Sequence, residues 1–258
     1  MKYYLGKAFV NIKDKNEYYA AISDAITGSN KKVFTYLNTH TFHLCYHFDQ
    51  FSRAFLSADY IYADGYSIVL ALKYLKKINI RKIVVSYLFF EELGKKFETE
   101  SKSIFLLGET EKTLEKAVEN LNINFPGIKI AGFSHGYFND SENEEIVSKI
   151  NTYSPEVLIV GMGAPKSEIW VQENINKLDV KCILCVGAFI KIAANESSLA
   201  PRWLYNTGLE WIHRLLKEPG RLFKRYLVSH SFFIYKFFQL LLFNESERSA
   251  PASSDKIT

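Results

Sequence analysis

The stretch that decides the fold is PEVLIVGMGAPKSEIW, residues 155–170. Its apolar run, Val157–Val160, has the length and composition of a β-strand that is covered on both faces. Gly161, Gly163 and Pro165 then predict a turn, and a helical pattern follows over Glu168–Asn174. A strand, a glycine-containing turn and a helix are the building block of a parallel α/β sheet.

The same alternation continues on both sides of this stretch. Further strands are predicted at Lys32–Leu37, Tyr60–Tyr62, Ile104–Leu107, Ile128–Ala131 and Cys182–Val186. Further helices are predicted at Glu17–Ile26, Phe42–Phe55, Ser67–Lys76, Glu111–Leu121 and Ser141–Ile150. Strands that alternate with helices imply right-handed crossovers. The fold class is therefore α/β, with a Rossmann-like, doubly wound and mainly parallel sheet.

Composition restricts the class of protein. The chain has 258 residues, 48% of them hydrophobic, and its net charge of +4 is too small to indicate binding to nucleic acid. Three cysteines argue against a disulfide framework, and Cys182 and Cys185 lie inside an apolar run, so we expect buried strand residues rather than a zinc site. The sequence contains neither a signal-peptide pattern nor an apolar stretch long enough to span a membrane, which favours the cytoplasm.

Polar and glycine-containing turns follow most of the predicted strands. They comprise Asn38, Asp64-Gly65, Gly108, Gly132–Phe138, Gly161–Pro165 and Gly187. The carboxyl ends of parallel strands meet at one edge of the sheet, where ligands bind in this class of fold. Each glycine alone could serve a tight turn. Their joint placement favours a cleft for a nucleotide or a sugar phosphate.

The C-terminal part has a different character. Residues 201–243 are predicted to form a helical appendage to a core of residues 1–200, and Lys and Arg are concentrated between Arg202 and Lys236. The apolar stretch Tyr226–Phe243 follows these basic residues, which is typical of a helix that lies in the surface of an anionic membrane. A final core helix or an oligomer contact remains the alternative. The polar tail, residues 244–258, is predicted to be disordered.

Several motifs resemble those of one known family. Gly161-Met162-Gly163-Ala164-Pro165-Lys166-Ser167-Glu168 resembles its strand-and-turn signature, and Ala63-Asp64-Gly65 its acidic motif. Leu106-Leu107-Gly108 and the segment from Gly132 to Phe138, with His135, Gly136 and Tyr137, are similar to two more motifs. Ala200-Pro201, Trp203, Gly208 to Arg214 and Glu218 to Tyr226 resemble the C-terminal signature. In this order, the motifs identify the chain as a member of the WecG/TagA/CpsF glycosyltransferase family.

The resemblance implies an inverting hexosyltransferase with a Rossmann-like fold. Family members transfer a sugar, typically of the N-acetylmannosamine type, from a UDP donor to a polyprenyl-diphosphate-linked saccharide in the synthesis of teichoic acid, capsule or other surface polysaccharides. They are thought to need no metal and no other cofactor. The appendage is thought to complete the active site at the membrane. The implied location is the inner face of the plasma membrane, with a homo-oligomer or other polysaccharide glycosyltransferases as further partners.

Asp64 and Asn38 are the candidate catalytic residues. Inverting transfer needs a base that takes a proton from the acceptor hydroxyl, and a carboxylate at a strand end can do this. Asp64 could instead cap the helix that follows it. Asn38 could bond the sugar or orient the acceptor, or it could cap the helix that starts near Phe42.

The leaving nucleoside diphosphate needs positive charge. Arg214, Arg221 and Arg225 are the candidates, because arginine makes charge-assisted, bidentate bonds to phosphate. Arg221 and Arg225 share a helix face if a helix restarts after Pro219-Gly220. A solvated basic face, or one that contacts anionic lipid head groups, is the alternative.

Other donor-binding candidates come from the motifs. Gly161 and Gly163 would let the backbone approach the nucleotide, and amides of the helix after Pro165 could face an anion. Tyr137 could stack on the nucleotide, whereas His135 is interpreted as a turn residue. The full set of further candidates is Gly108, Gly136, Tyr137, Gly161, Gly163, Pro165, Lys166, Glu168 and Lys191.

The chain departs from the family pattern at several positions. Ser167 replaces a glutamine, Lys191 an acid, Leu199 an arginine and Tyr36 a threonine, and Ile83–Leu88 replaces an Arg-Val-x-Gly-x-Asp segment near Arg81 and Lys82. Either the donor or acceptor differs, with Lys191 meeting the carboxylate of a uronic acid, or the chain is a catalytically silent subunit of a polysaccharide assembly complex. Because Asp64 and the arginines are present, we favour an active enzyme of altered specificity.

Overall fold

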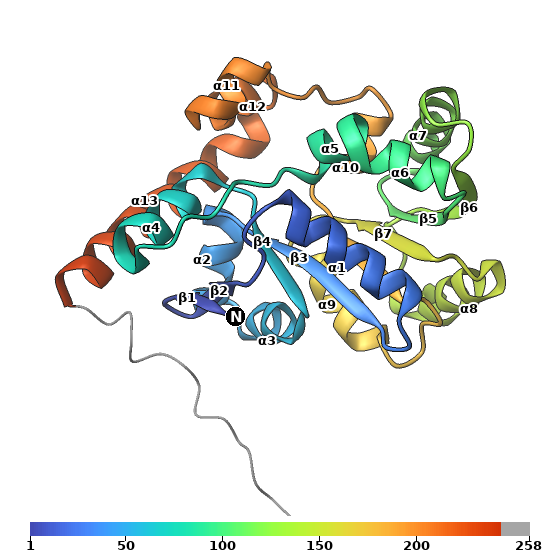
Figure 1. Ribbon diagram of the computed structural model, residues 1–258, viewed down its shortest axis with the longest axis horizontal. Helices are drawn as coiled ribbons and strands as arrows, with labels where there is room; N and C mark the ends of the chain where they lie inside the picture. Colours follow the sequence, from blue (N-terminus) through green and yellow to red (C-terminus); the bar gives the residue numbers. More distant parts are fainter. Residues whose placement is uncertain (244–258) are drawn as a thin grey trace, which may run out of the picture.

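The computed structural model describes residues 1–243, except for the side chains of residues 202, 205, 206, 221 and 243. Within this part of the chain, six parallel strands form the central sheet in the order β4-β3-β8-β7-β5-β6 (Figure 1). They are β3 (Lys32–Leu37), β4 (Tyr60–Ala63), β5 (Ser103–Gly108), β6 (Lys129–Ser134), β7 (Val157–Gly161) and β8 (Cys182–Cys185). The predicted Rossmann-like α/β fold is confirmed.

The strands form where the apolar runs predict them, with small shifts at their ends. In β7 every residue is buried, because alternate side chains meet helices on opposite faces of the sheet. Cys182 and Cys185 are buried free cysteines of β8, as the sequence predicts.

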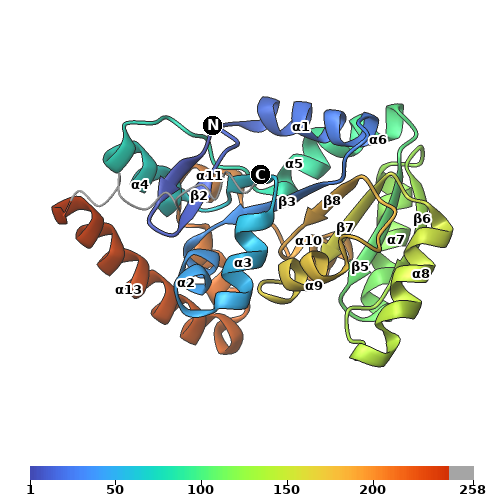
Figure 2. The same cartoon turned by 90° about the horizontal axis from the view of Figure 1, so that it is seen from below.

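Helices cover both faces of the sheet (Figure 2). One face carries α1 (Lys15–Thr27), α5 (Val85–Leu88), the π-helical turn η1 (Phe89–Leu93), α6 (Gly94–Thr99), α7 (Glu111–Asn124) and α10 (Phe189–Ala193). The other carries α2 (Thr39–His47), α3 (Asp49–Ser57), the 3₁₀ turn η2 (Asp140–Glu142), α8 (Asn143–Tyr153) and α9 (Lys166–Asn174). Helix α4 (Tyr66–Lys76) lies beside the edge strand β4.

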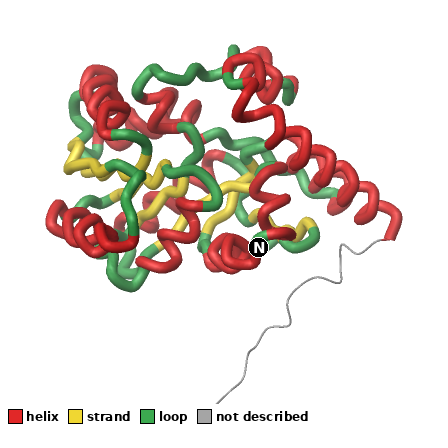
Figure 3. Tube along the Cα trace, turned by 180° about the vertical axis from the view of Figure 1, so that it is seen from behind, coloured by secondary structure: helices red, strands yellow, loops and turns green. Residues whose placement is uncertain are grey.

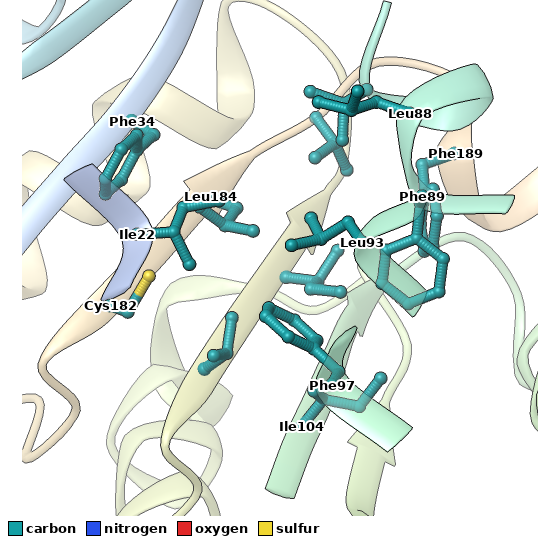
Figure 4. Packing of buried hydrophobic residues seen from close by; sticks show 14 of the residues in the cluster. Ile22, Phe34, Leu88, Phe89, Leu93, Phe97, Ile104, Cys182, Leu184 and Phe189 are labelled. Atoms are coloured by element: carbon teal, nitrogen blue, oxygen red, sulfur yellow. The ribbon is translucent and has the colours of Figure 1, made fainter. Parts of the chain in front are cut away.

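The core under the first helical layer is aliphatic and aromatic (Figure 4). Ile22 of α1 and Leu184 of β8 lie in one cluster with Phe89 and Phe189. The last two rings pack edge to face, with centroids 4.8 Å apart. This packing fixes α10, and with it the turn after β8, against the sheet.

Several features differ from the predictions, which did not include α5, η1, α6 or α10. The single helix expected over Phe42–Phe55 is wrong, because the backbone of Phe48 is extended and divides the segment into α2 and α3. An antiparallel hairpin of β1 (Tyr3–Leu5) and β2 (Ala8–Val10) was not anticipated, since each strand has only three residues and gives too short a pattern.

The C-terminal region is helical, as predicted. It consists of α11 (Arg202–Thr207), α12 (Glu210–Lys217) and the long α13 (Pro219–Phe243), which lies along α2 at the side of the molecule (Figure 3). Trp211 of α12 packs edge-on against Tyr226 of α13, with centroids 6.3 Å apart. The predicted disordered tail, residues 244–258, lies outside the described residues.

Helix α13 has two apolar faces with different surroundings. Leu222 is buried, and Phe233 and Leu240 are buried within the core cluster that includes Phe42 of α2, which agrees with the interpretation as a final core helix. A second set of apolar side chains is exposed: Phe223, Leu227, Val228, Ile234, Tyr235, Phe238, Leu241 and Leu242. None of the helices described is long and apolar enough to cross a membrane.

Candidate active site

The carboxyl ends of β3, β4, β7 and β8 border a cavity of about 120 Å³, here called the rim cavity. Predicted residues that line it are Asn38, Asp64, Gly161, Gly163, Lys191, Arg214 and Arg225. Tyr36 and Glu109 also line it. The structure therefore brings both catalytic candidates together with two of the three arginines. The side chain of Arg221 lies outside the described part of the structure.

Asn38 has two roles at once. Its side-chain oxygen accepts hydrogen bonds from the backbone amides of His40 (3.0 Å) and Thr41 (3.1 Å), so it caps α2. Its side-chain amide donates to Oδ2 of Asp64 at 3.2 Å. Asn38 thus caps a helix and also lies beside Asp64 at the rim cavity, so one role does not exclude the other.

Asp64 is held at the end of β4 by its backbone amide, which donates to the carbonyl of Leu37 at 3.0 Å. Helix α4 begins after Gly65 without a side-chain cap, so the alternative that Asp64 caps this helix is wrong. Burial raises the pKa of Asp64 to about 6, while the Arg214 guanidinium and the hydrogen bond from Asn38 act in the opposite direction. Such a carboxyl is ionised at neutral pH and basic enough to accept a proton.

The arginines reach the site from the C-terminal helices. Arg214 belongs to α12 and Arg225 to α13, and both side chains line the rim cavity with Asp64. Arg225 and Arg221 lie on one continuous helix, because α13 begins at Pro219. The rim cavity is therefore closed on one side by the appendage.

The glycines at this rim serve different purposes. A Cβ on Gly108 would lie 2.5 Å from the carbonyl carbon of Gly161, and one on Gly136 would lie 2.9 Å from the Cα of Gly108. These residues let three turns pack against each other. A Cβ on Gly163, whose φ is +80°, would have nothing within 4 Å, so this residue faces open space at the rim cavity.

Other predicted donor-binding residues do not line the rim cavity. Lys166 donates to the carbonyl of Gly136 at 2.6 Å, and Glu168 is buried and accepts from the hydroxyl of Thr35 at 2.8 Å. Burial raises the pKa of Glu168 to about 7. Pro165 follows a cis peptide bond and precedes α9, and Tyr137 is 69% exposed on the turn after β6. His135 lies on the same turn.

Lys191 has a carboxylate partner that the sequence did not suggest. Its Nζ lies 3.7 Å from Oε2 of Glu109, which follows β5, so the pair spans the end of β7. Glu109 has φ +51° and its carbonyl accepts from the amide of Gly136 at 2.9 Å. In the sequence, the position of Glu109 directly after Gly108 of the third strand motif is the only indication that Glu109 lies near the site.

Two further residues near Asp64 were not predicted as site residues. Lys82 and Glu210 form an ion pair of 2.9 Å with side chains only 6% and 17% exposed. Glu210 and Asp64 line a side cavity of about 80 Å³ together with Tyr36, Val84, Tyr87 and Arg214. Glu210 lies within the C-terminal motif from Gly208 to Arg214, but the sequence does not show that its partner is Lys82.

Metal-ligating residues do not gather in the described part of the chain. Among residues 1–243, no group of three or more His, Cys, Asp and Glu side chains is arranged to hold a metal ion.

Comparison with known proteins agrees with the motifs. The profile of the glycosyl transferase WecG/TagA/CpsF family matches residues 3–247. An N-acetylglucosaminyldiphosphoundecaprenol N-acetyl-beta-D-mannosaminyltransferase of Staphylococcus aureus (strain MW2) is 31% identical over 211 residues, or 82% of this chain and 78% of that protein. The enzyme of the same name from strain MRSA252 is 32% identical over 211 residues, which again cover 82% of this chain and 78% of that protein. This chain belongs to the glycosyl transferase WecG/TagA/CpsF family.

Proposed function

We propose that this glycosyltransferase moves a sugar of the N-acetylmannosamine type from UDP to a polyprenyl-diphosphate-linked saccharide. The observation that carries the proposal is the rim cavity itself, where Asp64, Asn38, Arg214 and Arg225 meet. The names of the relatives supply the donor sugar and the kind of acceptor.

Asp64 is the proposed general base. As the acceptor hydroxyl attacks C1 of the donor sugar, its proton passes to the Asp64 carboxylate. The new bond forms at C1, and the bond from C1 to the UDP oxygen breaks with inversion. The hydrogen bond from Asn38 at 3.2 Å keeps the carboxylate in place for this step.

Arg214 and Arg225 are proposed to stabilise the leaving UDP. Their guanidinium groups make charge-assisted bonds to phosphate oxygens, and the open backbone at Gly163 leaves room for the diphosphate. These cations can offset the charge of the diphosphate, so the proposed mechanism uses no metal. Arg221 on the same helix is a further candidate by its position.

The donor is proposed to be a neutral N-acetylated sugar rather than a uronic acid. Lys191 is the cation that would meet a sugar carboxylate, but Glu109 already lies 3.7 Å from it. The pair leaves little net charge at this end of the rim cavity.

We further propose that the protein works in the cytoplasm, on the inner face of the plasma membrane. Apolar side chains are exposed on α13 and also on the preceding helix α12, where they are Trp211, Ile212 and Leu216. Such a surface can bury its side chains in the lipid interface, near a lipid-linked acceptor. A homo-oligomer or a complex with other polysaccharide glycosyltransferases stays a prediction.

The test is turnover by the purified full-length protein with a lipid-linked N-acetylglucosamine acceptor and a panel of UDP-sugars. UDP release is expected with the N-acetylmannosamine donor. Asp64→Asn should lower kcat by roughly 10²- to 10⁴-fold, the usual contribution of a general base. Undiminished turnover by that variant would exclude Asp64 as the base. Absence of turnover with every donor, together with co-purification of another glycosyltransferase, would instead support the silent-subunit alternative.

A further inference from the structure

A further and larger cavity lies beside the active site. It has a volume of about 460 Å³, within the range of roughly 300–1,000 Å³ that is typical of small-molecule sites. We call it the outer cavity. Its wall is formed by Tyr66 and Val69 of α4, Arg81 and Lys82 of the connection between α4 and α5, Tyr87 of α5 and Glu91 of η1. Figure 1 shows this connection running below α11 and α12. The outer cavity shares no lining residue with the rim cavity.

Two smaller cavities, both lined by Asp64, share lining residues with the outer cavity. Val84 and Tyr87 line both the outer cavity and the side cavity that contains Asp64. Tyr66 lines the outer cavity and a fourth cavity, of about 90 Å³, which Asp64 and Arg214 also line. The outer cavity is thus linked to the proposed base through Val84, Tyr87 and Tyr66, none of which lines the rim cavity.

Inverting transfer requires this kind of arrangement. The attacking hydroxyl approaches C1 from the side opposite the leaving group, with the base next to the hydroxyl. If UDP occupies the rim cavity, the acceptor has to reach Asp64 from another direction. We propose that the outer cavity binds the sugar diphosphate of the lipid-linked acceptor, with Arg81 contacting the diphosphate; this inference rests on the function proposed above.

Arg81 is the group of the outer cavity that suits a diphosphate, although the carboxylate of Glu91 also belongs to the lining. Lys15 is paired with Glu92 at 2.5 Å, and Lys82 with Glu210 at 2.9 Å. Arg81 has an exposed side chain and makes no ion pair with any residue of the described chain. A guanidinium that is not neutralised by the protein can make bidentate bonds to phosphate oxygens.

The backbone around Arg81 is held in place. The amide of Arg81 donates to the carbonyl of Lys13 at 2.7 Å, and the amide of Ile83 donates to the carbonyl of Ala63 at 2.8 Å. The second bond joins the connection directly to the residue before Asp64. The distance from the diphosphate site to the base is therefore set by the fold before the acceptor binds.

The tyrosines suit the sugar of the acceptor. Tyr66 and Tyr87 stand at the inner end of the outer cavity, where they also border the cavities of Asp64. Aromatic faces pack against the apolar faces of sugar rings, while the carboxylate of Glu91 can accept hydrogen bonds from sugar hydroxyls. A sugar at this end has its hydroxyls closest to Asp64, and its diphosphate points towards Arg81.

The test measures binding rather than turnover. Full-length protein saturated with UDP is titrated calorimetrically with N-acetylglucosamine linked to a short, water-soluble prenyl diphosphate. Arg81→Glu should weaken binding by roughly tenfold or more, as expected for the loss of a charge-assisted contact. Val69→Trp, which fills the outer cavity without changing charge, should weaken binding as well. Arg53→Glu is the matched control, because Arg53 is an exposed arginine of α3 that lines none of these cavities.

The outcomes separate this inference from the proposed function. Loss of probe binding in Arg81→Glu and Val69→Trp, with binding retained in Arg53→Glu, supports the outer cavity as the acceptor site. Equal binding by all variants, or no binding to the unaltered protein, overturns it. UDP affinity should be the same in all four proteins, whereas failure of the proposed function would appear separately, as absence of sugar transfer by a protein that binds UDP.

Discussion

The side chain of Asn38 joins a helix cap to the proposed catalytic base. Its oxygen accepts from the amides at the start of α2, and its Nδ2 donates to Oδ2 of Asp64 at 3.2 Å. The two residues follow neighbouring strands, β3 and β4, which pair in parallel register up to Leu37 and Ala63. The orientation of the carboxylate is thus tied to the position of a helix.

Replacement of Asn38 by alanine should affect both stability and pH dependence. Loss of the cap is expected to lower the free energy of unfolding by about 1 kcal/mol. Loss of the hydrogen bond should raise the pKa of Asp64 further, because that bond favours the ionised form. The measurements are thermal unfolding and the pH profile of kcat/KM. Asp14→Ala is the control, since the Asp14 carboxylate caps α1 through the amides of Asn16 and Glu17 and should leave the pH profile unchanged. An unshifted profile in Asn38→Ala would contradict the assigned contact.

The pKa of Asp64 predicts the pH dependence of the unaltered enzyme. The base must be ionised, so activity should fall below about pH 6, where the carboxyl takes up a proton. The same group affects stability with a defined sign. Its pKa is raised in the folded protein, so the folded state binds more protons, and this contribution to stability decreases as pH rises from about 4 to 6. The residual activity of Asp64→Asn should not show this fall below about pH 6. If the fall persists in that variant, another titrating group causes it.

The glycines of the rim should respond differently to alanine. Gly108→Ala places a Cβ 2.5 Å from the backbone carbonyl carbon of Gly161 and should destabilise the fold strongly. Gly163→Ala meets no atom within 4 Å, so only its positive φ is unfavourable, by roughly 1 kcal/mol. We expect Gly163→Ala to fold and to weaken UDP binding by narrowing the rim cavity. Calorimetry of unfolding and of UDP binding checks both; full UDP affinity in Gly163→Ala would show that the nucleotide does not approach this backbone.

The pair of Lys191 and Glu109 predicts how donor choice can be altered. In the unaltered enzyme, UDP-linked uronic acids should be poor donors because Glu109 already pairs with Lys191. Glu109→Gln leaves the cation without this carboxylate and should raise kcat/KM for an acidic donor, relative to the neutral one, by roughly twofold to fivefold. Glu115→Gln, on the exposed side of α7, is the control. A preference of the unaltered enzyme for an acidic donor would contradict this interpretation of Lys191.

The exposed face of α13 predicts membrane binding that is independent of catalysis. Leu227→Ser combined with Leu241→Ser should reduce co-sedimentation with anionic vesicles, because both side chains are exposed on that helix. Ile123→Ser removes an even more exposed apolar side chain from α7 and should leave sedimentation unchanged. UDP affinity should be the same in all variants. If the double variant sediments with vesicles as fully as the unaltered protein, another surface of the protein binds the membrane.

Much of the fold and part of the site follow from local patterns. Runs such as Val157–Val160 predict strands because a strand buried on both faces needs apolar residues at every position. The turns after these strands then fall on one edge by topology alone. Asn38, Asp64, Gly161 and Gly163 could therefore be placed together from their positions in the sequence. The break at Phe48 could not, because apolar periodicity continues through it.

The tertiary structure decided what each polar side chain contacts. The motif that contains Lys166 and Glu168 is local, but their partners Gly136 and Thr35 come from distant parts of the sequence, so both turn out to bond within the protein. Lys191 meets Glu109 only because β7 lies between β5 and β8 in the sheet. Sequence patterns indicate which segments are apolar enough to be buried, and that depends on each segment by itself. Charge pairing and cavity walls depend on which segments become neighbours, and strand order and helix packing settle that across the whole chain.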